Sequence, residues 1–220
     1  FRRVLFRSKT DSDTMMLTVY GIQQINESVF ANGSGSFGNT KVKNKSKRIG
    51  YLNNNVTEET ATGKYTTLSY AVNGGFGYNY RVSETVLVTP TMGLSYTQMN
   101  DNGYTETGTR NQNQTITKKD ASKFEGSVGI GVATATEMNG LIVMPEIHAN
   151  VRHAFTNEQP KVKVQVSGAV EDMTPKKAKA QKTFYGVGAG VGVKSGNMDY
   201  RVSCDGEFAK KYQGVNGSLS

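Results

Sequence analysis

The sequence predicts an all-β protein, an antiparallel up-and-down β-barrel that spans a membrane, and three observations lead to this prediction. Apolar and polar residues alternate with a period of two through long stretches, most clearly in 184–194 and 198–208, and this period is that of β-strands. Short turns alternate along the chain with long polar connections, an asymmetry typical of outer-membrane barrels. Hydrophobic residues make up only 36% of the chain and form no run long enough for a transmembrane helix.

The strands expected from this alternation follow one another as a meander. Within 65–80, for example, Tyr70, Val72 and Phe76 fall on one face, and small or polar residues fall on the other. In order, the expected strands are residues 14–24, 29–43, 65–80, 85–99, 123–136, 141–155, 183–194 and 198–211, about eight in all, with the start of a last one at 217–219. Long polar connections are expected at 44–63, 100–122 and 156–182.

Turn sequences delimit the hairpins. The first two turns are Ile25-Asn-Glu-Ser28 and Arg81-Val-Ser-Glu84, and the next two are Glu137-Met-Asn-Gly140 and Ser195-Gly196-Asn197. Pro90 and Pro145 lie inside expected strands, and each predicts a bulge, because proline cannot donate a ladder hydrogen bond. The alternation in 161–166 suggests that strands continue beyond the membrane.

The alternation also assigns side chains to two faces. A soluble sandwich would bury its apolar face, whereas a membrane barrel turns that face to lipid and its polar face to a wet lumen. The residues expected to face lipid are Tyr70, Val72, Phe76, Leu94, Ile130, Val187 and Val202. The charged residues expected in the lumen are Glu125, Glu146, His148, Arg152, Arg201, Asp205 and Glu207. Aromatic residues expected in interface girdles are Tyr65, Tyr78, Tyr80, Tyr96, Phe124, Phe155, Tyr185 and Phe208.

Four glycines alternate along the seventh expected strand, at Gly186, Gly188, Gly190 and Gly192. One interpretation is an inward groove that leaves room for a helix, which is about 10–12 Å across. The other is that glycine relieves barrel curvature. The run is not a dinucleotide fingerprint, because Val191 breaks the spacing and no helix follows. No cofactor is expected.

The sequence gives little indication of a disulfide, a metal site, a catalytic site or a nucleic-acid interface. The single cysteine, Cys204, excludes an internal disulfide, and His148 and His153 are expected on opposite faces, which argues against a metal site. No Ser/His/Asp set and no aromatic-interleaved basic stripe is present, so neither an enzyme nor nucleic-acid binding is expected. Lysines near the long connections either contact lipopolysaccharide phosphates or form a solvated face. They are Lys41, Lys43, Lys45, Lys47, Lys161, Lys163, Lys176, Lys177, Lys179 and Lys182, together with Arg48.

The opening octet differs from the rest of the chain. Residues 1–8 can be back-translated into a sequence that resembles a common short-read sequencing adapter, so we interpret them as an assembly artefact. Without Arg2, Arg3 and Arg7 the formal net charge falls from +8 to +5. Residues 9–220 then form the barrel domain, which is expected to be truncated at both ends.

Several runs resemble the autotransporter β-domain, most closely that of the rickettsial surface cell antigens. They are Gly35-Ser-Phe-Gly-Asn-Thr-Lys-Val-Lys-Asn-Lys-Ser46, Leu87-Val-Thr-Pro-Thr-Met-Gly-Leu-Ser-Tyr96, Asn102-Gly-Tyr-Thr-Glu-Thr-Gly108, Lys123-Phe-Glu-Gly126, Tyr185-Gly-Val-Gly-Ala-Gly190, Lys211-Tyr-Gln-Gly214 and Gly217-Ser-Leu219. The resemblance covers about residues 9–219 and depends on the order and spacing of the runs. It implies a twelve-stranded barrel of a type V secretion protein, of which this chain would hold strands four to eleven and the start of strand twelve.

The resemblance also implies a function and partners. It implies that the barrel lies in the bacterial outer membrane, is inserted by the barrel assembly machinery, and exports an N-terminal passenger, an adhesin-like surface antigen, to the cell surface. A helical linker would occupy the lumen, where the charged residues would hold it or assist passenger cleavage; alternatively they form a solvated wall with ion pairs. The alternative function is a small stand-alone barrel acting as a porin or adhesin. A soluble all-β enzyme or lectin is a weaker third reading.

Overall fold

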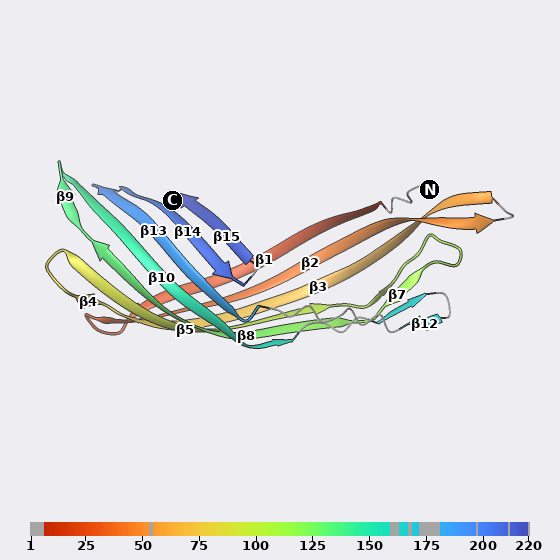
Figure 1. The fold of residues 1–220 in the computed structure, drawn as a ribbon, viewed down its shortest axis with the longest axis horizontal. Coiled ribbons are helices and arrows are strands. Elements are labelled where there is room, and N and C mark those ends of the chain that lie inside the picture. Colours follow the sequence, from red (N-terminus) through yellow and green to blue (C-terminus); the bar gives the residue numbers. More distant parts are fainter. Residues whose placement is uncertain are drawn as a thin grey trace.

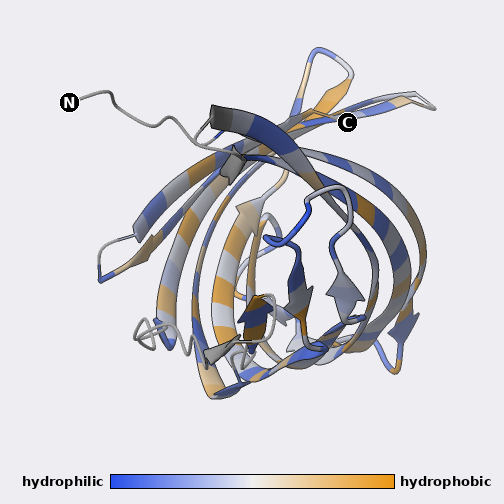
Figure 2. Cartoon of the chain, turned by 90° about the vertical axis from the view of Figure 1, so that its right-hand side faces the viewer, coloured by the Kyte–Doolittle hydropathy of each residue, from blue (hydrophilic) through white to orange (hydrophobic). Residues whose placement is uncertain are grey.

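Most of the chain forms one long antiparallel sheet that curls about an axis (Figure 1, Figure 2). The computed structural model describes residues 7–52, 55–158, 163–166, 169–171, 181–196, 198–210 and 212–219. The strand order along the sheet is β1-β2-β3-β5-β8-β10-β13-β14-β15, so successive long strands are neighbours, and β1 and β15 are its edges. The long strands are β1 (Ser8–Gln24), β2 (Val29–Leu52), β3 (Asn55–Tyr78), β5 (Val86–Asp101), β8 (Lys119–Thr134), β10 (Leu141–Glu158), β13 (Thr183–Ser195), β14 (Met198–Ala209) and β15 (Tyr212–Leu219). The predicted up-and-down meander is confirmed.

The four short turns expected from the sequence lie together at one end of the sheet (Figure 1). In the first of them, the side-chain Oδ1 of Asn26 accepts hydrogen bonds from the backbone N–H groups of Ser28 (2.9 Å) and Val29 (2.8 Å). In the turn before β10, Asn139 and Gly140 both have positive φ, 53° and 77°. This is the backbone that tight hairpin turns require and that asparagine and glycine adopt most readily.

The first long polar connection is not a loop, contrary to the prediction for 44–63. β2 and β3 continue as a paired hairpin, in register from Asn44↔Gly63 to Leu52↔Asn55. The sequence favoured a loop because this stretch is long and polar. Threonines on β3 and an ion pair between Lys47 and Glu58 support the pairing instead.

The other two long connections contribute to a separate small sheet with the order β12-β11-β7-β6. Its strands are β6 (Tyr104–Thr105), β7 (Gln114–Ile116), β11 (Val164–Val166) and β12 (Ala169–Glu171). The prediction that 161–166 continues the barrel strands is therefore wrong for β11, and Lys161 and Val162 lie outside the described residues. Figure 2 looks at the long-connection end and shows the small sheet within the outline of the curled sheet.

The two prolines interrupt pairing but cause no bulge. Opposite Pro90, β3 ends and β4 (Tyr80–Arg81) begins, and opposite Pro145, β8 gives way to β9 (Thr136–Met138). The register is the same on both sides of each interruption, so the predicted bulges at these prolines are wrong. The register shifts instead between Ala154 and Thr156 of β10.

The apolar side chains are on the outside of the curled sheet and not packed between two sheets. In the described part of the chain, the buried hydrophobic residues are only Ala61, Ile116 and Ala154. Of the residues predicted to face lipid, Val72, Phe76, Leu94, Ile130, Val187 and Val202 are all at least half exposed. An apolar surface of this extent is not stable in water and fits a lipid environment. No helix among the described residues is long and apolar enough to cross a membrane.

Aromatic residues form an outward-facing belt near the long-connection end. Tyr70 lies against Tyr96 with ring centroids 6.5 Å apart, and Phe124 lies against Phe155 at 5.5 Å. Such belts mark the interface between lipid and water. Tyr65 does not belong to the belt, contrary to the prediction, because its position in the register places it on the opposite face.

The two-faced sheet generates a prediction from two neighbouring residues at the same depth on β5. Leu94 points outward and Ser95 inward, where Ser95 opposes Glu125 of β8. We expect Leu94→Arg to lower the free energy of unfolding in phospholipid vesicles by about 2–4 kcal/mol, because it places a cation in lipid. Ser95→Arg, the matched control, should cost well under half as much. Urea titration in vesicles measures both, and equal penalties would contradict the assignment of the two faces.

Candidate functional site

The candidate site is the inner, concave face of β8, β10, β13 and β14. The register places His148, Gly188 and Asp205 directly opposite one another on β10, β13 and β14. The other charged residues named from the sequence share this face. Glu125 is on β8, Glu146 and Arg152 are on β10, and Arg201 and Glu207 are on β14.

Two ion pairs and one histidine–aspartate contact cross this face from β10 to β14 and pass over β13. The Nε2 of His148 lies 2.7 Å from the Oδ1 of Asp205. Arg152 pairs in the same way with Glu207, and Arg201 pairs with Glu146. Strands two apart in a sheet are separated by about 9.5 Å, so each pair is made by side chains that extend toward each other across the intervening strand.

The glycines of β13 make these crossings possible. A Cβ atom built on Gly188 would overlap both Asp205 and His148, and one on Gly186 would lie 2.7 Å from the side-chain Oδ1 and Nδ2 of Asn150. A Cβ on Gly190 would lie 3.1 Å from the Oε1 of Glu146. The space above these glycines is therefore filled by side chains of the neighbouring strands, including those of the ion pairs.

Arg152 is the most connected residue of the face. Besides Glu207 it contacts Glu125, with 3.3 Å between Nη1 and Oε1, and its guanidinium lies 5.5 Å from the ring centroid of Phe184. Lys123 also pairs with Glu125 and lies 5.7 Å from the same ring. Phe184 and Lys123 were not predicted as site residues, although the period-two alternation places both on the inner face.

A hollow of about 840 Å³ confirms that this face is concave. Tyr20 and Ile22 of β1 line it together with Glu125 of β8 and Arg152 of β10. These strands are not neighbours in the sheet, so their side chains meet only because the sheet curls toward them. No group of histidine, cysteine and acidic residues that could hold a metal ion occurs among the described residues.

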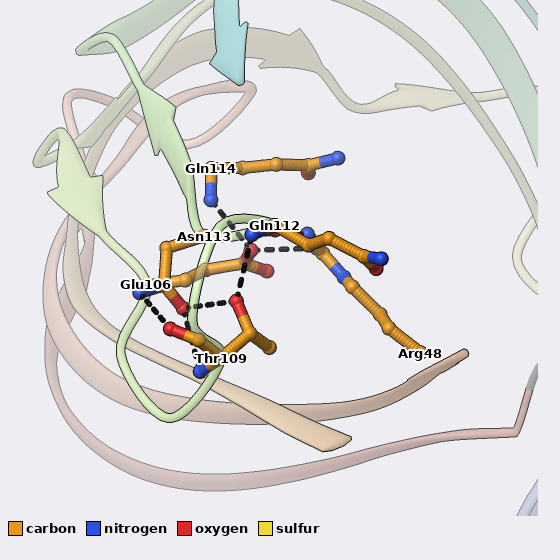
Figure 3. A network of polar contacts seen from close by, with 6 residues as sticks. All are labelled: Arg48, Glu106, Thr109, Gln112, Asn113 and Gln114. Atoms are coloured by element: carbon orange, nitrogen blue, oxygen red, sulfur yellow. Dashed lines mark hydrogen bonds and ion pairs between the residues drawn. The ribbon is translucent and has the colours of Figure 1, made fainter. Parts of the chain in front are cut away.

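A second polar cluster lies at the long-connection end, between β2 and the segment that joins β6 and β7 (Figure 3). The Nη2 of Arg48 lies 2.6 Å from the Oε2 of Glu106, and these side chains are only 13% and 5% exposed. Arg48 also donates to the carbonyl of Gln112, and Glu106 accepts a 2.9 Å hydrogen bond from the N–H of Gln114. This mouth cluster holds the small sheet against the inner face of the β2–β3 hairpin.

An aromatic contact reinforces the mouth cluster. Tyr104 of β6 stacks on Tyr65 of β3, with centroids 5.0 Å apart, and covers Gly63. Burial, and secondarily the negative charge of Glu106, raises the pKa of the Tyr104 phenol. Arg48 and Glu106 were not predicted to pair, because 58 residues separate them and no local pattern links them.

The chain is similar in sequence to a known protein family and to several outer membrane proteins. The family profile described as autotransporter beta-domain matches residues 4–203. Outer membrane protein B of Rickettsia japonica is 35% identical over 214 residues, which is 96% of this chain and 13% of that protein. Outer membrane protein A of Rickettsia rickettsii is 32% identical over 96% of this chain and 10% of that protein. This chain therefore spans a small part of the length of these relatives.

A solved structure shows the same fold. The translocator domain of autotransporter NalP from Neisseria meningitidis superimposes with a TM-score of 0.66. The alignment covers 96% of this chain and 66% of that domain, at 16% sequence identity. The curled sheet thus has the architecture of part of a translocator barrel.

The glycines of β13 lead us to expect that replacing even one of them with alanine lowers the free energy of unfolding. Gly188→Ala should lower the free energy of unfolding by about 1 kcal/mol, because its methyl group separates His148 from Asp205. Gly74→Ala is the matched control, since Gly74 lies in a strand with open space around it. In a His148→Ala background the effect of Gly188→Ala should disappear. A penalty that persists there in urea titrations would contradict this account.

Breaking the Arg48–Glu106 pair of the mouth cluster should allow the small sheet to detach locally from the β2–β3 hairpin. Glu106→Gln leaves the Arg48 guanidinium buried without its counter-ion, which we expect to cost about 3–5 kcal/mol of local stability. Hydrogen exchange at the Gln114 amide should accelerate accordingly. Lys47→Gln, which removes an exposed ion pair from the same hairpin, should change that exchange by less than about tenfold. Unchanged exchange in Glu106→Gln would show that the pair does not hold the small sheet.

Proposed function

This chain belongs to the autotransporter β-domain family, and we propose that its concave face lines the path by which an upstream passenger leaves the cell. By that membership the chain is an outer-membrane translocator and anchor domain. The observation that supports the proposal most directly is that one continuous sheet carries most of its exposed apolar side chains on its outer face and the ion pairs of β8, β10 and β14 on its inner face. An inner face of this kind suits a polar segment that must cross the membrane without contacting lipid.

We further propose that the partner on the inner face is the passenger's own linker in helical form. Arg152 lines the hollow, and Arg201 and Glu146 present charge on the same inner face, where Asn150 and Ser203 present neutral polar groups. The glycines of β13 contribute indirectly, since neighbouring side chains cover them. The linker would therefore contact the crossing ion pairs, not a groove of bare backbone.

Two further expectations belong to the same proposal. The barrel assembly machinery is the expected folding partner, because a barrel of this family must be inserted into the outer membrane after it crosses the periplasm. Catalysis by this chain is not expected, since the work of such a domain is translocation and anchoring. The passenger is expected to be a surface antigen, in line with the outer membrane proteins to which this chain is similar.

The test follows an epitope placed in the native reading frame upstream of Lys9. In intact cells that express the gene with its upstream frame, added protease should remove the epitope, because it is displayed outside. The control carries Leu94→Arg, which should block stable insertion and leave the epitope protected. A protected epitope with a correctly inserted barrel would contradict export.

The porin alternative makes a different prediction in the same cells. A stand-alone porin would have a signal peptide and no long passenger upstream. It would raise the permeability of the outer membrane to small solutes without displaying an upstream epitope. That combination would replace translocation with a pore function.

A further inference from the structure

We propose that the outer face of the β1–β2–β3 edge carries a binding site for the phosphates of lipopolysaccharide in the outer leaflet. The site, called here the lysine strip, consists of Lys41, Lys43 and Lys45 of β2 and Lys64 of β3. The proposal rests on the outer-membrane placement of the domain and concerns its lipid contacts, not its export function.

The register gives the strip its direction. Along β2, Phe37 points outward to lipid, and positions 39, 41, 43 and 45 follow on the same face. The outer face of β2 thus changes from aromatic to cationic within four residues of Phe37. On β3 the same change occurs between Tyr70 of the aromatic belt and Lys64. The lysines therefore begin immediately beyond the lipid–water interface, which is where headgroup phosphates lie.

The central observation is a pair of like charges. Lys43 and Lys64 are directly opposite in the register, and both are exposed. Directly opposed residues have Cβ atoms about 4.5–5.5 Å apart, and like charges at this spacing destabilise a hairpin. An anion held between the two ammonium groups removes this repulsion. Lys41 and Lys45 follow at two-residue intervals, about 7 Å away on each side, and extend the positive charge along the strand.

The neighbouring acidic groups offset only part of this charge, because Lys9 of β1 opposes Lys45 and adds a further cation on the same face. On β1, Asp13 opposes Lys41 and Asp11 opposes Lys43. The Asp11 carboxylate lies 3.0 Å from the ammonium of Lys9. Further along the hairpin, Glu58 is paired with Lys47. Among the described residues, no ion pair within 4.0 Å involves the four lysines of the strip.

The occupant is lipopolysaccharide because of the position of the strip. The long-connection end of an outer-membrane barrel is the extracellular end, and lipopolysaccharide supplies the phosphates of that leaflet. A soluble phosphate would have no reason to prefer a row of lysines that starts at the edge of the apolar surface. A lipid that keeps its acyl chains against Phe37 and Tyr70 places its phosphates at Lys43 and Lys64.

The experiment uses this chain within its complete reading frame, folded in zwitterionic detergent micelles and titrated with fluorescent lipid A that carries both phosphates. Lys43→Gln/Lys64→Gln should weaken binding about tenfold or more, because each lysine near an anionic surface contributes attraction that is lost. The matched control is Lys118→Gln/Lys182→Gln, which removes the same charge from exposed lysines outside the strip and should bind as the unmodified chain does. Lipid A without phosphates should bind weakly to all three proteins.

A second readout separates binding from a merely structural role. Without lipid A, Lys64→Gln should leave the stability of the β2–β3 hairpin unchanged or raise it, because it removes a like-charge contact. With lipid A the same variant should be less stabilised than the unmodified chain. Equal binding by the strip variant and the unmodified chain would overturn the proposal, as would equal losses in the two double variants. Either result would leave the export test unaffected.

Discussion

The structure depends on one constraint, that a segment in lipid must pair all its backbone hydrogen-bonding groups within the protein. A meander of long antiparallel strands meets this constraint for every strand except those at the edges. Once the strands are paired, side chains can only alternate between the two faces. The register from Leu17↔Phe37 at one edge to Val202↔Leu219 at the other keeps apolar residues on the same side, because a shift of a single residue would exchange the faces.

The glycine row of β13 shows how this constraint shapes the inner face. Both sequence-based readings, a groove for a helix and relief of curvature, assigned the glycines a role of their own. The structure shows a further role, since removing side chains from one strand allows His148 and Asp205 on the two flanking strands to meet. Arg152 and Arg201 are therefore paired with Glu207 and Glu146 across three strands, which lowers the cost of placing these charges on one wall.

Most of the correct sequence-based predictions, the strands and the faces of their side chains, came from the local period-two pattern. It placed Arg152 and Glu207 on one face and Val187 on the other, because alternate residues along a strand point to opposite faces. It could not show that 44–63 pairs with itself, because lysine and glutamate are disfavoured in strands when they are considered singly and support one another only once Lys47 faces Glu58. Nor could it show that Glu106 reaches Arg48, because that contact depends on how the small sheet folds back.

The β2–β3 hairpin extends the sheet beyond the membrane. Its pairing continues past the aromatic belt, so the alternation of faces continues where lipid no longer enforces it. Arg48 consequently points inward and is buried against Glu106, while Lys43 and Lys45 point outward and remain exposed. Neighbouring basic residues of one strand thus lie on different faces, with Arg48 in the inner contact that holds the small sheet and Lys43 and Lys45 on the outer surface. A run that reads as uniformly basic in the sequence is two distinct chemical surfaces in the folded protein.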